Sequence, residues 1–166
     1  MVGIQWEQHT TFLDDRRRVR SIRKRVRESV RARTNHPAAF CYTIGNEISA
    51  SIIRRQGPRR VERFILKLYQ TAKNEDPEVL VTYVNYPTTE YLEFPFLDFA
   101  CFNAYLESRY ILARYLARLQ NLTGNRPLVM AKIGPDSHRN GEEEQAASLR
   151  WRLRLFPDRR MAPGRA

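Results

Sequence analysis

The sequence predicts an α/β protein in which the strands of a parallel sheet alternate with helices. Short apolar runs, typical of strands buried on both faces, alternate with segments whose apolar residues recur every three or four positions. Polar residues follow the apolar runs at their C-terminal ends. Parallel sheets carry their functional sites at that edge, so these polar residues are the first candidates for a site.

The first amphipathic segment covers residues 14–33 and is dominated by arginine. Its apolar residues, spaced by three or four, are Val19, Ile22, Val26 and Val30. We expect a helix that buries this narrow aliphatic face and leaves its arginines in solvent. His36-Pro37 ends the segment, because a residue before proline disfavours helical backbone.

The remaining elements follow the same alternation. Strands are predicted at residues 38–44, 79–86, 96–105 and 127–134, with a shorter run at 2–6. Helices are predicted from Gly57-Pro58 to about Asp76, at 110–122 and at 141–156. The helix at 110–122 is expected to bury Ile111, Tyr115, Leu116, Leu119 and Leu122. Together they form one domain over residues 1–157, followed by an unstructured tail at 158–166.

Composition limits the partners and the compartment. No membrane-spanning run or signal peptide is recognisable, so we expect a cytoplasmic protein whose two cysteines, Cys41 and Cys101, are reduced and buried. No glycine-rich phosphate motif follows a strand, and no Cys, His or carboxylate spacing indicates a metal site. We therefore expect neither cofactor nor metal.

The net charge of +11 raises nucleic acid as a partner. Ten of the 29 basic residues lie between Arg16 and Arg33. No aromatic side chains are interleaved with them for stacking on bases, so the pattern favours a solvated helix face over a nucleic-acid interface.

The polar residues at the strand ends are Asn46 and Glu47, Asn85, Asn103 and Tyr105, and Lys132. A doubly wound sheet and a (β/α)8 barrel both place active sites at this edge, and the alternation of elements leaves both architectures open.

Specific motifs resemble a known family. His36-Pro37, followed by a strand that ends in Gly45-Asn46-Glu47, resembles the fourth-strand signature of clan A glycosidases. The closest likeness, from about Trp6 to Phe156, is to the catalytic barrel of glycoside hydrolase family 2, the β-galactosidases, β-glucuronidases and β-mannosidases. The resemblance implies a partial (β/α)8 TIM barrel, about strands 3 or 4 to 7. Strands one, two and eight of the barrel have no counterpart in the sequence.

The resemblance also implies roles for the strand-end residues. Glu47 would be the acid/base catalyst, and Asn46 would bind the substrate 2-hydroxyl. Asn103 and Tyr105, in the Asn-x-Tyr segment of the sixth strand, would line the site, although hydrogen bonding at a strand end is the plainer alternative. Trp6 and His9, near a third-strand end, would contact sugar or serve ordinary packing.

One position departs from the family. The seventh strand should end in the nucleophilic Glu, but the matching stretch is Met130-Ala131-Lys132-Ile133-Gly134. Retaining hydrolysis uses two carboxyl groups roughly 5–5.5 Å apart, and Lys132 cannot form the glycosyl ester.

Three functional hypotheses remain. The first is a family 2-like segment, descended from enzymes that hydrolyse β-glycosides but inactive as written. The second is a carbohydrate-binding remnant, or one subunit of a split barrel, which self-associates or pairs with the missing barrel half through open sheet edges. A basic nucleic-acid-binding module is the third and least favoured.

Overall fold

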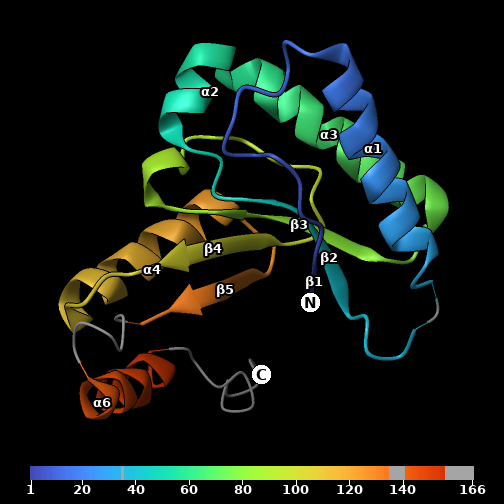
Figure 1. Ribbon diagram of the computed structural model, residues 1–166. Coiled ribbons are helices and arrows are strands. Elements are labelled where there is room, and N and C mark those ends of the chain that lie inside the picture. The colour runs from blue at the N-terminus through green and yellow to red at the C-terminus, as the bar shows by residue number, and fades with distance from the viewer. Residues whose placement is uncertain (35, 135–140, 156–166) are drawn as a thin grey trace. The chain divides into compact units, whose positions relative to one another are not determined.

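The computed structural model describes residues 1–34, 36–134 and 141–155 (Figure 1). The strands within them are β1 (Val2–Gly3), β2 (Cys41–Asn46), β3 (Leu80–Asn85), β4 (Ala100–Ala104) and β5 (Leu128–Ile133). The helices are α1 (Arg16–Arg31), α2 (Ala50–Gln56), α3 (Pro58–Glu75), α4 (Arg109–Thr123) and α6 (Glu142–Leu153), with a short 3-10 turn, η1 (Pro87–Thr89). The tail predicted at residues 158–166 lies outside the described residues.

The strands form one sheet in the order β1-β2-β3-β4-β5. The pairs β1–β2, β2–β3 and β3–β4 are parallel. A doubly wound sheet reverses its strand order at a switch point, whereas a barrel adds each strand beside the preceding one. The sequential order therefore settles the choice that the sequence pattern left open, and confirms a partial α/β barrel.

The chain divides into two compact units, which are described separately. Unit 1 comprises Met1–Asn103 and Asn125–Ala131. Unit 2 comprises Ala104–Gly124 and the chain from Lys132 onward.

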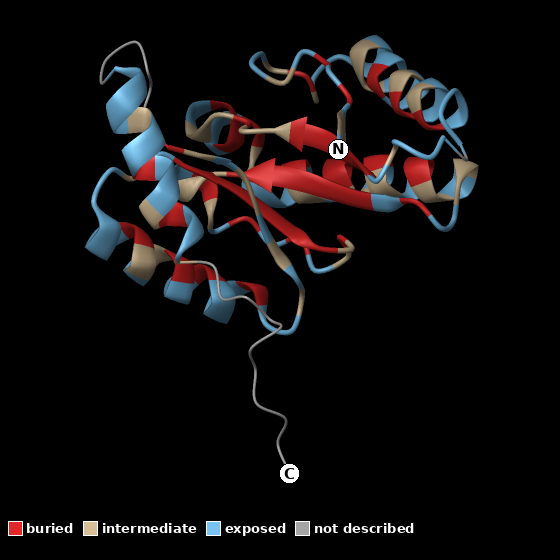
Figure 2. Cartoon of the chain, turned by 90° about the horizontal axis from the view of Figure 1, so that it is seen from below, coloured by how far each residue is buried: buried red, intermediate tan, exposed pale blue. Residues whose placement is uncertain are grey.

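In unit 1, α3 packs against β2 and β3, and α1 packs against α3 (Figure 1). Strands β2, β3 and β4 are buried over most of their length, whereas the helices alternate buried and exposed faces (Figure 2). Ile22, Val26 and Val30 of α1 are fully buried and Val19 is half-buried, which confirms the face predicted from their spacing. Asp15 caps α1 by accepting from the backbone N–H groups of Arg17 and Arg18.

Two predicted strands begin later than expected. Phe40, which we placed in a strand, is 68% exposed and precedes β2. Residues 96–99 form a turn before β4 because the Asp98 carboxylate accepts a hydrogen bond from the Val81 backbone N–H (2.7 Å) and forms an ion pair with Lys73 (3.1 Å). The side chain thus replaces one backbone acceptor, while the Asp98 backbone N–H still donates to the Val81 carbonyl (3.2 Å), and the start of β4 is tied to β3 and α3.

Helix α2 was not predicted. It ends at Gln56, whose buried amide oxygen accepts hydrogen bonds from the backbone N–H groups of Phe12 (2.8 Å) and Leu13 (2.9 Å) in the amide orientation that satisfies its neighbours. Gly57 then turns the chain into α3 with a φ of 85°, a conformation that favours glycine. This buried glutamine fixes the segment that leads into α1.

In unit 2, the buried residues of α4 are Leu112, Leu116, Leu119 and Thr123. Our prediction for this helix was partly wrong, because Ile111 is 52% and Leu122 is 49% exposed. Apolar residues occupy more than half of the helix circumference, so their spacing could not select the buried stripe.

Strand β2 contains an irregularity just before its polar end. Thr43 pairs with Thr82 of β3 but Asn46 pairs with Val84, so β2 has one more residue than β3 over this stretch. Gly45 lies within it, and a Cβ at that position would be 3.1 Å from the Tyr83 ring and 3.3 Å from the Trp6 ring. Two packed aromatic rings therefore leave little room for a side chain here.

We predict that Gly45→Ala lowers the free energy of unfolding by about 1–3 kcal/mol, because the added methyl group must displace a buried ring. Urea unfolding followed by circular dichroism measures the change. Gly3→Ala is the control, since its Cβ would meet only Thr43 Oγ1 at an ordinary 3.5 Å, and its effect should stay within about 0.5 kcal/mol. Equal effects at the two positions would contradict the packing account.

We also predict that the chain self-associates when it is expressed alone. In the described sheet, β1 and β5 are the edge strands, and each edge offers unpaired backbone groups to another chain. Size-exclusion chromatography with light scattering at two concentrations measures the mass. A concentration-independent monomer that unfolds cooperatively would show that the edges are covered in another way.

Candidate functional site at the strand ends of unit 1

The chain turns sharply where β2 ends. Glu47, the first residue after the strand, has a φ of 50°, and it is the only non-glycine residue with positive φ in the part of the chain that the structure describes. This left-handed conformation costs on the order of 1–3 kcal/mol and concentrates at functional sites. Within the described chain, the backbone thus concentrates its strain at the residue predicted to be the acid/base catalyst.

Two hydrogen bonds hold this turn. The Glu47 backbone N–H donates to the Val84 carbonyl (2.9 Å), and the Ile48 backbone N–H donates to the Tyr83 hydroxyl (2.9 Å). Tyr83 is buried, and this burial raises the pKa of its hydroxyl well above the ordinary value. The hydroxyl therefore stays neutral and remains a fixed acceptor beneath the turn.

The side chains of Asn46, Glu47 and Asn103 form a hydrogen-bonded cluster. The Asn103 amide nitrogen donates to Glu47 Oε1 (2.8 Å) and to Asn46 Oδ1 (3.1 Å). Because the nitrogen faces two acceptors, the contacts themselves favour this orientation of the amide. One asparagine therefore orients both polar side chains at the end of β2.

Asn103 reaches this cluster from β4, which is separated from β2 by β3. It is fully buried, and its Oδ1 has no hydrogen-bond partner among the residues described. Asn85, the end residue of the intervening strand, instead hydrogen-bonds Thr89 and the Tyr86 backbone and holds η1. Strand-end position alone therefore did not distinguish a cluster residue from a turn residue.

Gln8 is a member of the site that sequence reasoning missed. Its side-chain oxygen accepts a hydrogen bond from the Asn46 backbone N–H (2.8 Å), which fixes the residue before Glu47. A glutamine in a loop carries no distinctive sequence signal, and only the fold brings it to the end of β2.

The structure separates the two other residues proposed near the third strand end. Trp6 is buried between Phe12 and Phe64, and its indole N–H donates to the Ile44 carbonyl (2.8 Å), so it serves the packing role. His9 is exposed in the turn that follows Gln8.

Tyr105 and Lys132 belong to unit 2. Tyr105 follows β4 directly and is 52% exposed, while Lys132 is an exposed residue of β5. The cluster that the structure brings together in unit 1 is thus Asn46, Glu47 and Asn103, supported by Gln8 and Tyr83.

No group of three or more His, Cys, Asp or Glu side chains that could hold a metal occurs among the described residues. None of the described helices has the length and apolarity needed to cross a membrane. Both cysteines are free and buried, and burial raises the pKa of Cys101 to about 12.

The geometry defines what the cluster can do. A partly exposed carboxyl group at a strand end, held by an amide N–H, can exchange a proton with a bound hydroxyl or ether oxygen. The neighbouring Asn46 offers polar atoms for a second hydroxyl. Such a cluster suits a polyhydroxylated ligand, and its one carboxylate supplies half of the pair that retaining glycoside hydrolysis needs.

Solved structures share this fold. They include β-glucuronidases from Faecalibacterium prausnitzii (22% identity, TM-score 0.67), from Ruminococcus gnavus in complex with D-glucuronic acid (17%, 0.68) and from Bacteroides uniformis (18%, 0.73). The matches cover 83%, 83% and 87% of this chain but only 26%, 27% and 20% of those proteins, respectively. At these identities the likeness shows the fold.

No protein of curated function matches the sequence. The sequence profile described as glycosyl hydrolases family 2, TIM barrel domain, matches residues 2–145, most of the chain. The motifs at the strand ends, the sequential parallel sheet and this match agree, and the chain belongs to the TIM barrel domain of glycosyl hydrolase family 2.

Proposed function

We propose that this chain is the segment of a β-glycosidase barrel that carries the acid/base catalyst, and that it is inactive as written. The observation that carries the proposal is the Glu47 cluster, in which a strained strand-end carboxyl group is held by Asn103 beside Asn46. Family membership supplies the reaction class, which is hydrolysis of a β-glycosidic bond.

In this proposal Glu47 protonates the leaving oxygen and later activates water, as the acid/base residue of a retaining glycosidase does. Asn46 hydrogen-bonds the 2-hydroxyl of the sugar. Asn103 is a positioning residue, because its amide donates to both of these side chains and fixes their relative orientation. Tyr105 adds a sugar contact from the chain that follows β4.

Lys132 is the reason for proposing inactivity. In the family pattern this position on β5 carries the nucleophile. A protonated amine has no lone pair with which to attack the anomeric carbon, and a neutral amine would not give the glycosyl ester from which the second step proceeds. Without that carboxylate the two-step reaction cannot begin.

The solved relatives suggest the first ligands to test. They are β-glucuronidases, and the structure of one is in complex with D-glucuronic acid. We propose that the ligand of this chain is a β-glycoside and that a β-glucuronide is the first candidate, with β-galactosides and β-mannosides as comparisons.

Carbohydrate binding without hydrolysis is the second candidate function, whether by this chain alone or as one subunit of a split barrel. Lys132 favours it, since this substitution removes the nucleophile but leaves Asn46, Glu47 and Asn103 in place. A nucleic-acid role for α1 is not favoured, because its aliphatic face is buried and, among the described residues, no hydrogen bond or ion pair joins its arginines to the strand-end cluster.

We predict that restoring a carboxylate at position 132 restores hydrolysis in a complete barrel. Residues 2–145 would replace the matching segment of the F. prausnitzii β-glucuronidase, with Lys132 retained or with Lys132→Glu. We expect the Lys132→Glu chimera to hydrolyse an aryl β-glucuronide at least about a thousandfold faster, equivalent to about 4 kcal/mol of activation free energy. Initial rates measure the difference.

The two chimeras differ at one residue and are compared only as monodisperse proteins with matching circular dichroism. Lys132→Gln controls for simple loss of the cation and should stay inactive. Equal rates for Lys132 and Lys132→Glu would show that position 132 is not the nucleophile position.

We further predict that the chain binds a non-hydrolysable aryl β-thioglycoside through the cluster. Asn103→Ala should weaken binding by about tenfold, because it leaves Glu47 and Asn46 without their shared donor. Titration followed by nuclear magnetic resonance measures the affinity. Asn121→Ala, an exposed asparagine on α4, is the matched control and should have no effect. If both variants bind like the unaltered chain, the cluster is not a sugar site.

A further inference from the structure

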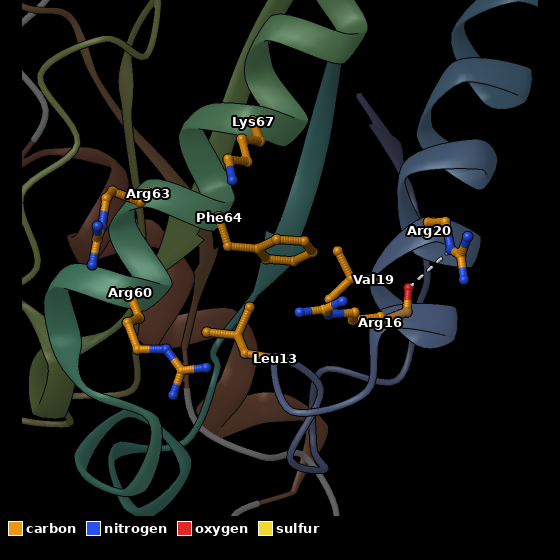
Figure 3. A pocket seen from close by; sticks show the side chains of 8 residues that line it. All are labelled: Leu13, Arg16, Val19, Arg20, Arg60, Arg63, Phe64 and Lys67. Carbon is orange, nitrogen blue, oxygen red and sulfur yellow. Dashed lines mark hydrogen bonds between the residues drawn. The ribbon is translucent and has the colours of Figure 1, made fainter.

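A groove with a basic lining lies between α1 and α3 of unit 1, and none of its lining residues belongs to the strand-end cluster (Figure 3). Its volume is about 600 Å³. Five of its eight lining residues are basic: Arg16 and Arg20 from α1, and Arg60, Arg63 and Lys67 from α3. The other three are Leu13, Val19 and Phe64.

The positive charge of this groove is largely uncompensated. Arg60 forms an exposed ion pair with Asp14 at 3.4 Å. In residues 1–34, 36–134 and 141–155, the other four basic residues form no ion pair. Elsewhere on the same helices some arginines are paired with an acid. Arg27 and Arg31 of α1 both form ion pairs with Glu75 of α3. Most basic residues of the described chain form no ion pair, and the groove brings four of them together with Arg60 around one recess.

The cations also occupy positions that the helices themselves disfavour. Arg16 begins α1 beside the acidic N-cap Asp15, whereas Arg60 lies in the first turn of α3, which contains no acid and has no side-chain cap. The N-terminal end of a helix carries partial positive charge, so a cation there destabilises the helix. Mutual repulsion among five cations adds to this cost. An anion bound in the groove would offset both the unfavourable position at the helix end and the repulsion among the cations.

The hydrogen bonds of these arginines leave donors available. Arg20 and Arg63 each use Nε to bond the carbonyl of the residue four positions earlier, at 3.3 and 3.1 Å. These bonds hold the two guanidinium groups at the flanks of the groove, on residues that are exposed to solvent (Figure 3). Oriented guanidinium forks are the preferred partners of phosphate oxygens.

The dimensions of the groove indicate which class of polyanion it can bind. Arg60, Arg63 and Lys67 lie within eight residues of α3, so seven helical rises, or about 10 Å along the helix axis, separate the first from the last. A cavity of about 600 Å³ is typical of small-molecule sites. The cations surround a recess whose apolar residues are only partly exposed or buried, whereas a duplex or a bilayer would require a flat or protruding basic surface.

We propose that this groove binds a compact, soluble polyanion of the polyphosphate class, carrying at least three negative charges within about 10 Å. The phosphate oxygens accept hydrogen bonds from Arg16, Arg20 and Arg63 and pair with Lys67. The site is independent of the Glu47 cluster, so it holds whether or not the chain binds sugars.

The test is a calorimetric titration of the full chain with inorganic tripolyphosphate at low and at physiological salt. The groove variant is Arg16→Gln with Lys67→Gln, and the matched control is Arg54→Gln with Arg55→Gln, which removes the same charge from exposed positions on α2. We expect the groove variant to lose at least tenfold in affinity and the control to stay within twofold. Arg16→Lys with Lys67→Arg should retain most of the affinity, because it keeps the charge.

Thermal melting separates loss of the site from loss of the fold. Without ligand, the groove variant should melt at the same temperature as the unaltered chain or higher, since it relieves repulsion, and tripolyphosphate should raise the melting temperature of the unaltered chain and the control only. Equal losses in the groove and control variants would overturn the proposal in favour of a general charge effect. Absence of tripolyphosphate binding, with groove-dependent binding of an oligonucleotide or of anionic vesicles, would overturn it in favour of a macromolecular partner.

Discussion

The geometry of the strand-end site depends on the hydrogen bond between the Ile48 backbone N–H and the Tyr83 hydroxyl. This bond fixes the residue after Glu47, while the ring of the same tyrosine packs against Gly45, two residues before Glu47. A single buried side chain of β3 thus supports both sides of the turn. The strained backbone at Glu47 persists because the surrounding packing leaves no relaxed alternative. The direction of the Glu47 carboxyl group, and with it the contact from Asn103, follows from this support.

The sequence predicted the features that repeat and missed those that arise from one side chain. The spacing of Ile22, Val26 and Val30 identified the buried face of α1, because a helix that covers a sheet must bury a stripe of this period. The late start of β4 could not be foreseen, since it depends on the Asp98 carboxylate bonding the backbone of a distant strand. The same is true of α2, whose end is fixed by contacts of Gln56 with the segment before α1.

The candidate site likewise contains residues that the sequence predicted and residues that it missed. Asn46, Glu47 and Asn103 were identified because family motifs mark them, and the structure joins them by hydrogen bonds. Gln8 and Tyr83 were not identified, although the first bonds the backbone of Asn46 and the second supports Glu47. Residues that orient a functional group act through the fold, so their chemistry alone does not mark them in a sequence. The motif marks the candidate residues, and the packing shows how they are held.

The reactivity of the buried cysteines reports on local opening of the sheet. Cys41 belongs to β2 and Cys101 to β4, the two strands that carry the Glu47 cluster, and both thiols lie in a small apolar cluster with Val84 and Phe99. With a pKa near 12, the Cys101 thiol supplies almost no thiolate at neutral pH while the sheet is closed. An alkylating reagent would therefore modify it mainly in conformations that expose β4. The rate of that modification reads out the local free energy of opening at the edge where the site is built.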